Sequence, residues 1–164
     1  MTFFHRIPGC GGHYTASKGD ISSPLNIADG KYKHNLMCDY VIRMPINTRV
    51  RLEFKKFELE ESASCKFDKL EIFEGTWNDA DEGLIGRYCG TQMPPVITSQ
   101  SNVVSIKFTT DWSASEEGFQ LTYKLSELFV NHYERIKIFK AIYYCPISRA
   151  SILNLMKISL NINF

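Results

Sequence analysis

Two acidic residues stand on either side of a cysteine in the middle of the chain. Glu60 and Asp68 flank Cys65, and a run with strand character follows at Leu70-Glu71-Ile72-Phe73. A disulfide near one end of a sheet would hold both acids in a fixed loop. Carboxylate oxygens are the ligands that hard cations prefer, calcium above all. The segment therefore predicts a calcium site, on condition that a third acid joins the first two.

The third acid stands much later in the chain, between two apolar runs. Asp111 follows the strand-like run that ends at Thr109 and precedes the restart at Gly118-Phe119, so it belongs to a strand-end loop. An aspartate in such a place is usually only a turn or cap residue. Asp111 alone therefore does not predict metal binding, and its interpretation depends on whether the other two acids lie beside it.

Length and composition predict one ordinary domain with a real core. The chain has 164 residues, of which 44% are hydrophobic and 23% are charged, so disorder of the whole chain is not expected. The net charge of +1 gives no reason to expect nucleic-acid binding. No stretch of 18 apolar residues occurs, so no transmembrane helix is expected.

The cysteines indicate an oxidising compartment. Four of the five lie in the first 89 residues, at Cys10, Cys38, Cys65 and Cys89, without zinc-ligand spacing. Spacing alone allows three pairings, and four free thiols in a cytosolic protein are the alternative. The opening residues lack the apolar region of a secretory signal peptide, so an exported protein would require this chain to be part of a longer one.

Short strands, and not helices, must position these residues. Apolar and polar side chains alternate with a period of two, and turn signals such as Asp29-Gly30 and Pro94-Pro95 separate the runs. The expected strands are Asp39–Met44, Val50–Lys55, Leu70–Phe73, Leu84–Tyr88, Val104–Thr109 and Phe119–Leu125. Regularly spaced strands with one apolar face predict a sandwich or barrel, in which two sheets bury their alternate residues against each other.

The composition changes after Leu125. Residues 129–164 contain no glycine, and Phe, Tyr, Met, Ile, Asn and Lys make up 21 of these 36 residues, as AT-rich codons would produce. Our hypothesis is that residues 126–164 derive from an unspliced or mispredicted coding end. A genuine amphipathic or partner-binding segment is the alternative, in which case Cys145 could pair with another chain.

A series of short motifs stands in order along the first three quarters of the chain. They are Cys10-Gly11-Gly12, Gly19-Asp20-Ile21-Ser22-Ser23-Pro24, Tyr32 with Asn35, Cys38-Asp39-Tyr40-Val41-Ile42, Phe57-Glu58-Leu59-Glu60, Cys65-Lys66-Phe67-Asp68-Lys69-Leu70-Glu71-Ile72-Phe73-Glu74-Gly75, Gly86-Arg87-Tyr88-Cys89-Gly90, Phe108-Thr109-Thr110-Asp111 and Gly118-Phe119. Together they resemble the CUB domain family of the calcium-binding type, over about residues 10–125. A proline expected after Tyr32 is missing, and Tyr40 replaces a common tryptophan.

The resemblance implies a fold, a disulfide pairing and a division of the chain. The fold is an all-β antiparallel sandwich with a jelly-roll-like topology, and the disulfides are Cys10–Cys38 and Cys65–Cys89. The division is an N-terminal lead of residues 1–9, a CUB domain of residues 10–125 and the tail of residues 126–164, which is not expected to be a domain. An extracellular or secreted location follows from the same resemblance.

The resemblance also implies a site. Its expected calcium ligands are Glu60, Asp68, Asp111 and, through its main-chain carbonyl, Ser113. Magnesium fits less well, because it demands octahedral geometry and retains its waters. The same residues, with Trp112, are expected to receive a lysine of an extracellular protein partner. Close carboxylates repel one another strongly without a cation, which agrees with this assignment.

The implied function is that of a non-catalytic, calcium-dependent interaction module, part of a larger secreted protease or receptor. A glycosidase acid pair would need a deep sugar cleft, which a small sandwich rarely has. The alternative is a stand-alone secreted protein that binds carbohydrate or a polyanion such as a glycosaminoglycan. For that alternative the sequence offers one basic cluster, whose default interpretation is a solvated strand face. Its members are Arg49, Arg51, Lys55, Lys56, Lys66 and Lys69.

Overall fold

The computed structural model describes residues 7–76 and 82–127 of the chain. Nine strands and one 3-10 turn follow one another in these residues. Their bounds are β1 (Gly12–Tyr14), β2 (Lys18–Ser22), β3 (Met37–Arg43), β4 (Thr48–Glu58), η1 (Ala63–Cys65), β5 (Lys69–Glu74), β6 (Leu84–Tyr88), β7 (Ile97–Thr98), β8 (Val103–Thr109) and β9 (Gly118–Glu127). None of the described residues forms a helix with the length and hydrophobicity that crossing a bilayer requires.

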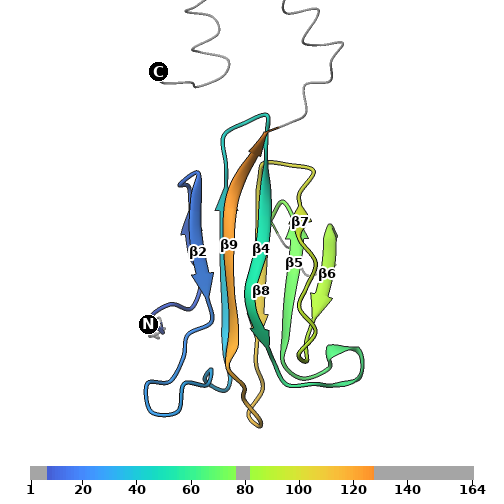
Figure 1. Ribbon diagram of the computed structural model, residues 1–164. Coiled ribbons are helices and arrows are strands. Elements are labelled where there is room, and N and C mark those ends of the chain that lie inside the picture. The colour runs from blue at the N-terminus through green and yellow to red at the C-terminus, as the bar shows by residue number, and fades with distance from the viewer. Residues whose placement is uncertain (1–6, 77–81, 128–164) are drawn as a thin grey trace, which may run out of the picture. The chain divides into compact units, whose positions relative to one another are not determined.

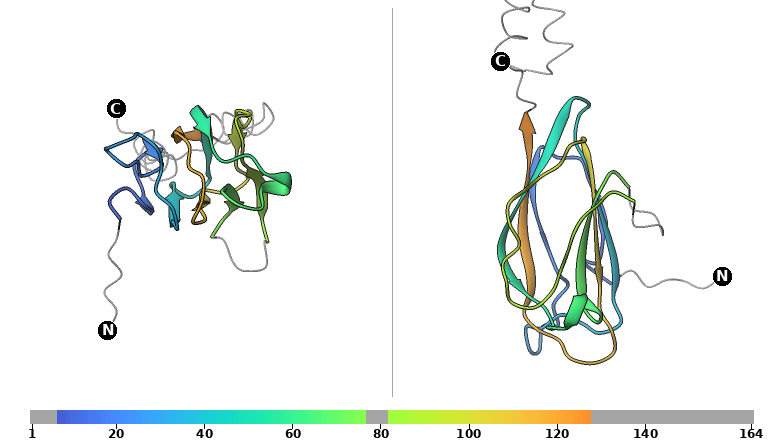
Figure 2. Two further views of the ribbon diagram at one scale, coloured as in Figure 1. Left: turned by 90° about the horizontal axis from the view of Figure 1, so that it is seen from below. Right: turned by 90° about the vertical axis from the view of Figure 1, so that its right-hand side faces the viewer.

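The strands form two sheets that face each other. One sheet has the strand order β1-β3-β8-β5-β6 and the other the order β2-β9-β4-β7 (Figure 1). Seen edge-on, the two sheets are the two layers of a sandwich (Figure 2). All strand pairs are antiparallel except β1 and β3, which run parallel. The predicted all-β sandwich is therefore confirmed, with one parallel pair at an edge.

The alternation of side chains fills the space between the sheets. On β3, Cys38, Tyr40 and Ile42 are completely buried, while their neighbours in sequence are more exposed. On β4 the register shifts between Phe54 and Lys56, and this bulge lets Phe57 remain in the core. β4 continues past the bulge to Glu58, beyond its predicted end at Lys55, and so reaches the loop that carries Glu60.

Three strands were not predicted, and each lacks the alternating pattern. β7 has two residues, and β2 buries Ile21 as its one large apolar side chain. β1 depends on Gly11 before it, where a Cβ atom would come within 2.5 Å of the Asp39 carbonyl oxygen. Gly11 also has a φ of +81°, which a residue with a Cβ rarely adopts. A glycine there lets β1 lie alongside β3.

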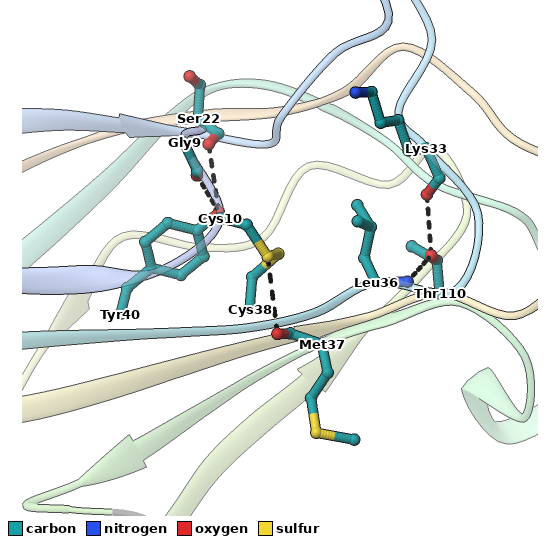
Figure 3. The surroundings of a disulfide bond; sticks show 9 residues. All are labelled: Gly9, Cys10, Ser22, Lys33, Leu36, Met37, Cys38, Tyr40 and Thr110. Carbon is teal, nitrogen blue, oxygen red and sulfur yellow. Dashed lines mark hydrogen bonds between the residues drawn. A yellow bond between two sulfur atoms is a disulfide. The ribbon is translucent and has the colours of Figure 1, made fainter. Parts of the chain in front are cut away.

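Both expected disulfides are present, Cys10–Cys38 and Cys65–Cys89. The first joins the start of β1 to β3, and the Tyr40 hydroxyl beside it donates to the Gly9 carbonyl at 2.9 Å (Figure 3). Figure 3 also shows Thr110, whose hydroxyl oxygen accepts from the Leu36 N–H and donates to the Lys33 carbonyl, each at 2.9 Å. Thr110 thereby ties the loop between β2 and β3 to the end of β8.

Parts of the predicted division lie outside the described residues. These are residues 1–6 of the expected lead and all of the expected tail except Ser126 and Glu127, which belong to β9. Cys145 lies outside them as well. The boundaries of the lead and the tail therefore stay predictions.

Candidate metal centre

Three acids from three separate loops meet at one end of the sandwich. Glu60 follows β4, Asp68 precedes β5 and Asp111 follows β8. One carboxylate oxygen of each lies within 4.8 Å of the corresponding oxygens of the other two. The loops involved lie at the lower end of the molecule in Figure 1. The structure thus brings together the three acids that the sequence singled out, although 51 positions separate the first from the last.

The loop that carries Glu60 is fixed against the end of β6. The Leu59 N–H donates to the Gly90 carbonyl at 2.9 Å, and Gly90 follows Cys89 directly. The Cys65–Cys89 disulfide joins the same two segments a few residues later. Glu60 therefore lies in a short loop that is anchored on both sides.

Asp68 is completely buried and joins the other parts of the cluster. Its Oδ2 accepts a hydrogen bond from the Tyr32 hydroxyl at 2.5 Å, and its Oδ1 accepts one from the Asp111 N–H at 2.8 Å. The Tyr32 hydroxyl oxygen in turn accepts from the Glu60 N–H at 3.0 Å. Each carboxylate oxygen has further lone pairs, so these bonds fix the orientation of Asp68 and leave it able to bind a cation.

Asp111 is oriented by its own loop. Its Oδ1 accepts from the Ser113 N–H at 2.8 Å and from the Ser113 hydroxyl at 3.0 Å. Its carbonyl oxygen accepts from the Asn35 N–H at 2.7 Å. Ser113 thus lies against the cluster through its N–H and hydroxyl groups, while the adjacent Trp112 side chain is 78% exposed.

Lys31, which is not one of the three acids, binds the loop between β8 and β9. Its ammonium group donates to the Ser115 carbonyl at 2.8 Å and pairs with the Glu116 carboxylate at 3.2 Å. The backbone of Tyr32 continues the contact, because its N–H donates to the Glu116 carbonyl at 3.0 Å. The loop before β3 and the loop before β9 therefore form one unit around the acids.

The electrostatics of the cluster are unfavourable to its negative charges. Burial raises the pKa of Glu60, and the charges of Asp68, Asp111 and Glu116 raise it further. Burial is also the main cause that raises the pKa of Asp68, against the lowering effect of the Tyr32 hydrogen bond. The Oε2 atom of Glu60 is buried and has no hydrogen-bond partner among the described residues. A cation placed among these oxygens would relieve the repulsion and supply the missing partner.

The spacing of the oxygens suits a large hard cation. Calcium binds oxygen at about 2.3–2.6 Å, so two of its ligands lie at most about 5 Å apart. The separations of up to 4.8 Å between the three carboxylates fall within this span. Magnesium at about 2.0–2.1 Å brings its ligands to within about 4.2 Å of one another. The donor set of this cluster therefore fits calcium.

Two contributors to the cluster were not assigned a role from the sequence. Tyr32 appears there only as one element of the family pattern, and Glu116 has no assigned role. Tyr32 lies 36 positions from Asp68 and is placed beside it by the fold, so no local spacing could reveal the contact. Glu116 lies five positions after Asp111, and its presence in the same short acidic loop was the available signal.

Comparisons with known proteins agree with this architecture. The family model of the CUB domain matches residues 10–123. Dog cubilin is 43% identical over 119 residues, which cover 71% of this chain and 3% of cubilin. Human membrane frizzled-related protein is 36% identical over 118 residues, which cover 72% of this chain and 20% of that protein. The chain thus spans a fifth or less of the length of these relatives.

A solved structure has the same fold. The crystal structure of the MASP-1 CUB2 domain bound to Ca2+ aligns with a TM-score of 0.60 and 29% identity, over 70% of this chain and 99% of that domain. Domains of this kind are typically extracellular protein-interaction modules of larger proteins and are in general non-catalytic. From its motifs, its two disulfides, its two sheets and these matches, we conclude that the chain belongs to the CUB domain family.

Proposed function

We propose that the domain is a calcium-dependent extracellular module that binds another protein. The observation that carries the proposal is the cluster of Glu60, Asp68 and Asp111, within which one buried carboxylate oxygen has no partner in the described part of the chain. The Ca2+-bound state of a structural neighbour with 29% identity supports the choice of ion. The carbonyl of Ser113 completes the proposed ligand set.

The ion acts by fixing three loops. Without it, the mutual repulsion of the carboxylates favours separation of the segments that follow β4, precede β5 and follow β8. With it, these loops form a rigid edge whose shape is set before a partner arrives, which lowers the cost of ordering on binding. The expected calcium affinity is that of an extracellular module, on the order of 10⁻⁴–10⁻³ M or somewhat tighter.

The partner group is a lysine ammonium. Carboxylates that bind the ion keep oxygens that can accept charge-assisted hydrogen bonds from an approaching cation. Trp112 is 78% exposed and Phe67 is 43% exposed, and each is adjacent in sequence to one of the acids. These two side chains provide apolar surface for the aliphatic part of the lysine and for its neighbours.

Calorimetry with calcium tests the metal site. Glu60→Gln and Asp111→Asn should each lower calcium affinity at least tenfold, because each removes a charged ligand. Glu61→Gln is the matched control, since Glu61 is an exposed acid next to Glu60 and outside the cluster. Unchanged calcium uptake in both cluster variants would refute the proposed site.

A lysine peptide tests the partner site. An immobilised peptide with one central lysine should retain the calcium-loaded domain, and acetylation of that lysine or a calcium chelator should abolish retention. Retention that survives acetylation would exclude lysine as the group recognised, and retention that survives the chelator would separate partner binding from the ion. The parent protein proposed is a larger secreted protease or receptor.

The basic cluster predicted for the polyanion-binding alternative is divided by the fold between β4, β5 and the 3-10 turn. Lys55 pairs with Asp20 at 2.9 Å, and Lys56 pairs with Glu117. Lys69 lies on β5 in the other sheet, and Lys66 follows the 3-10 turn. Four of the six basic residues of the predicted cluster therefore lie on β4, namely Arg49, Arg51, Lys55 and Lys56.

A further inference from the structure

A row of basic residues crosses the four-stranded sheet. Lys18 on β2 is paired directly with Lys124 on β9, and Lys124 is paired directly with Arg51 on β4. These three strands lie side by side in Figure 1. Directly opposite residues in an antiparallel sheet have Cβ atoms about 4.5–5.5 Å apart and side chains on the same face. The three charges therefore form a single line, which the sequence does not suggest.

The row faces away from the core. Lys18 and Lys124 are exposed and Arg51 is half-buried, whereas Leu52 and Tyr123, their neighbours in the strands, are buried. Arg49 projects from the same face of β4, two residues before Arg51. Its Nε atom is buried without a hydrogen-bond partner among the described residues. Four basic side chains thus belong to one small area, which we term the basic row.

Few negative charges compensate the basic row. The acids that follow along the same face are Asp20 and Glu53, paired across Thr122. Asp20 Oδ1 already accepts from Lys55 at 2.9 Å and from the Thr122 hydroxyl at 2.7 Å. Glu53 reaches Arg51 only at 3.9 Å. Like charges directly opposite each other in a sheet are destabilising, so the row carries a cost that an anionic ligand would remove.

We propose that the basic row, Lys18, Arg49, Arg51 and Lys124, binds a sulfated glycosaminoglycan chain. Strands lie about 4.8 Å apart, so three strands present charges over about 10 Å in a straight line. An extended polyanion with repeated sulfate groups matches such a line. Side chains that border the row are polar and include Thr98, Thr122 and Ser126.

An acidic protein segment fits this face less well. Protein interfaces derive most of their binding energy from buried aromatic or large apolar anchors. The large hydrophobic side chains that are exposed in the described residues all lie outside β2, β4 and β9. A charged surface without such anchors is better suited to a polyelectrolyte, whose binding is driven by the release of its condensed counterions.

The basic row lies far from the three acids. Arg51 is seven residues before Glu58, where β4 ends next to Glu60, and seven strand residues span roughly 23 Å. Binding at the row should therefore not need calcium. The inference stands apart from the proposed metal site and would survive its failure.

Heparin affinity with the full chain tests the proposal. We expect Lys18→Ser/Lys124→Ser to elute from immobilised heparin at clearly lower salt than the unmodified chain. Calorimetry with a heparin octasaccharide should show a loss of at least about fivefold in affinity, from two ionic contacts. The melting temperature of the Lys18→Ser/Lys124→Ser variant should stay the same or rise, because the substitutions remove a repulsive pair. This second measurement separates lost binding from lost folding.

Matched controls complete the experiment. Lys33→Ser/Lys66→Ser removes the same charge from two exposed lysines outside the row and should change affinity less than about twofold. Chemically desulfated heparin should not bind, and a calcium chelator should have no effect. Equal losses in the two double variants, or no binding by the unmodified chain, would overturn the proposal. Binding of poly-glutamate as tight as that of heparin would assign the row to acidic protein segments instead.

Discussion

The Tyr32 hydroxyl donates a hydrogen bond of 2.5 Å to Asp68 Oδ2, and both groups are buried at the centre of the acidic cluster. The same hydroxyl accepts from the Glu60 N–H at 3.0 Å. Burial raises the pKa of Tyr32, and the hydrogen bond to Asp68 raises it further, so the phenol keeps its proton. One uncharged group therefore holds two of the three acids in place without adding charge.

Tyr32→Phe should destabilise the domain and weaken calcium binding together. The substitution leaves Asp68 Oδ2 and the Glu60 N–H without their partner, which costs about 1–3 kcal/mol in the free energy of unfolding. Chemical denaturation in a chelator measures the first effect, and calcium titration measures the second. Tyr14→Phe is the control, because the Tyr14 hydroxyl makes no hydrogen bond in the part of the chain described. A Tyr32→Phe protein with unaltered stability would show that the hydroxyl is not needed to orient the acids.

The stability of the calcium-free domain should fall as pH rises above the ordinary carboxyl pKa. The pKa of Glu60 is raised by burial and by neighbouring charges, and that of Asp68 by burial. Between the ordinary and the raised pKa, the folded domain holds protons that the unfolded chain releases. Stability is therefore lost across this window as pH rises.

Calcium should reverse this loss, because it binds the deprotonated acids. The difference in melting temperature with and without calcium should be small near about pH 4 and grow toward about pH 7. Glu60→Gln should weaken the pH dependence of the calcium-free stability and the pH dependence of the calcium-induced shift in melting temperature. A difference that does not change with pH would mean that protons and the ion do not compete for the same groups.

The sequence predicts the fold where the alternation of apolar and polar residues matches the two-residue repeat of a β-strand. The six expected strands correspond to β3, β4, β5, β6, β8 and β9, and four of them, β4, β5, β8 and β9, show the period-two alternation. β1 and β2 are not predicted by this pattern. Gly11 lets the Asp39 backbone approach closely and Gly19 lets the Tyr123 side chain approach closely, and composition does not reveal either contact. The acids were found through the family pattern and the pairing of cysteines. Of the basic row, Arg49 and Arg51 belong to the predicted basic cluster, whereas Lys18 and Lys124 do not, because they are 106 positions apart and only strand pairing brings them together.

The two disulfides should have different effects on the proposed metal site. Removing either by paired serine substitution should cost about 3–4 kcal/mol in stability, since the closed loops have similar lengths of 24 and 28 residues. Cys65–Cys89 anchors the loop that carries Glu60, so its loss should also lower calcium affinity. Loss of Cys10–Cys38, at the start of β1, serves as the matched control and should lower it less. Equal reductions in calcium affinity would show that Cys65–Cys89 has no specific role at the acids.

Gly118→Ala should be among the most damaging small substitutions in the chain. Gly118 has a φ of +78°, and an added Cβ would overlap the Ser23 hydroxyl oxygen. That oxygen accepts from the Phe119 N–H at 3.1 Å and so aligns the start of β9 with β2. We expect a loss of about 2–4 kcal/mol in the free energy of unfolding, from backbone strain and displacement of Ser23 together. Gly30→Ala is the matched control, because Gly30 has a similar φ of +72°, and no atom of residues 7–76 and 82–127 lies within 4 Å of its Cβ position. Strain alone should cost that variant about 1–2 kcal/mol. If denaturation gave equal losses for both, the contact with Ser23 would contribute nothing, and the alignment of β9 would have to rest on strand pairing alone.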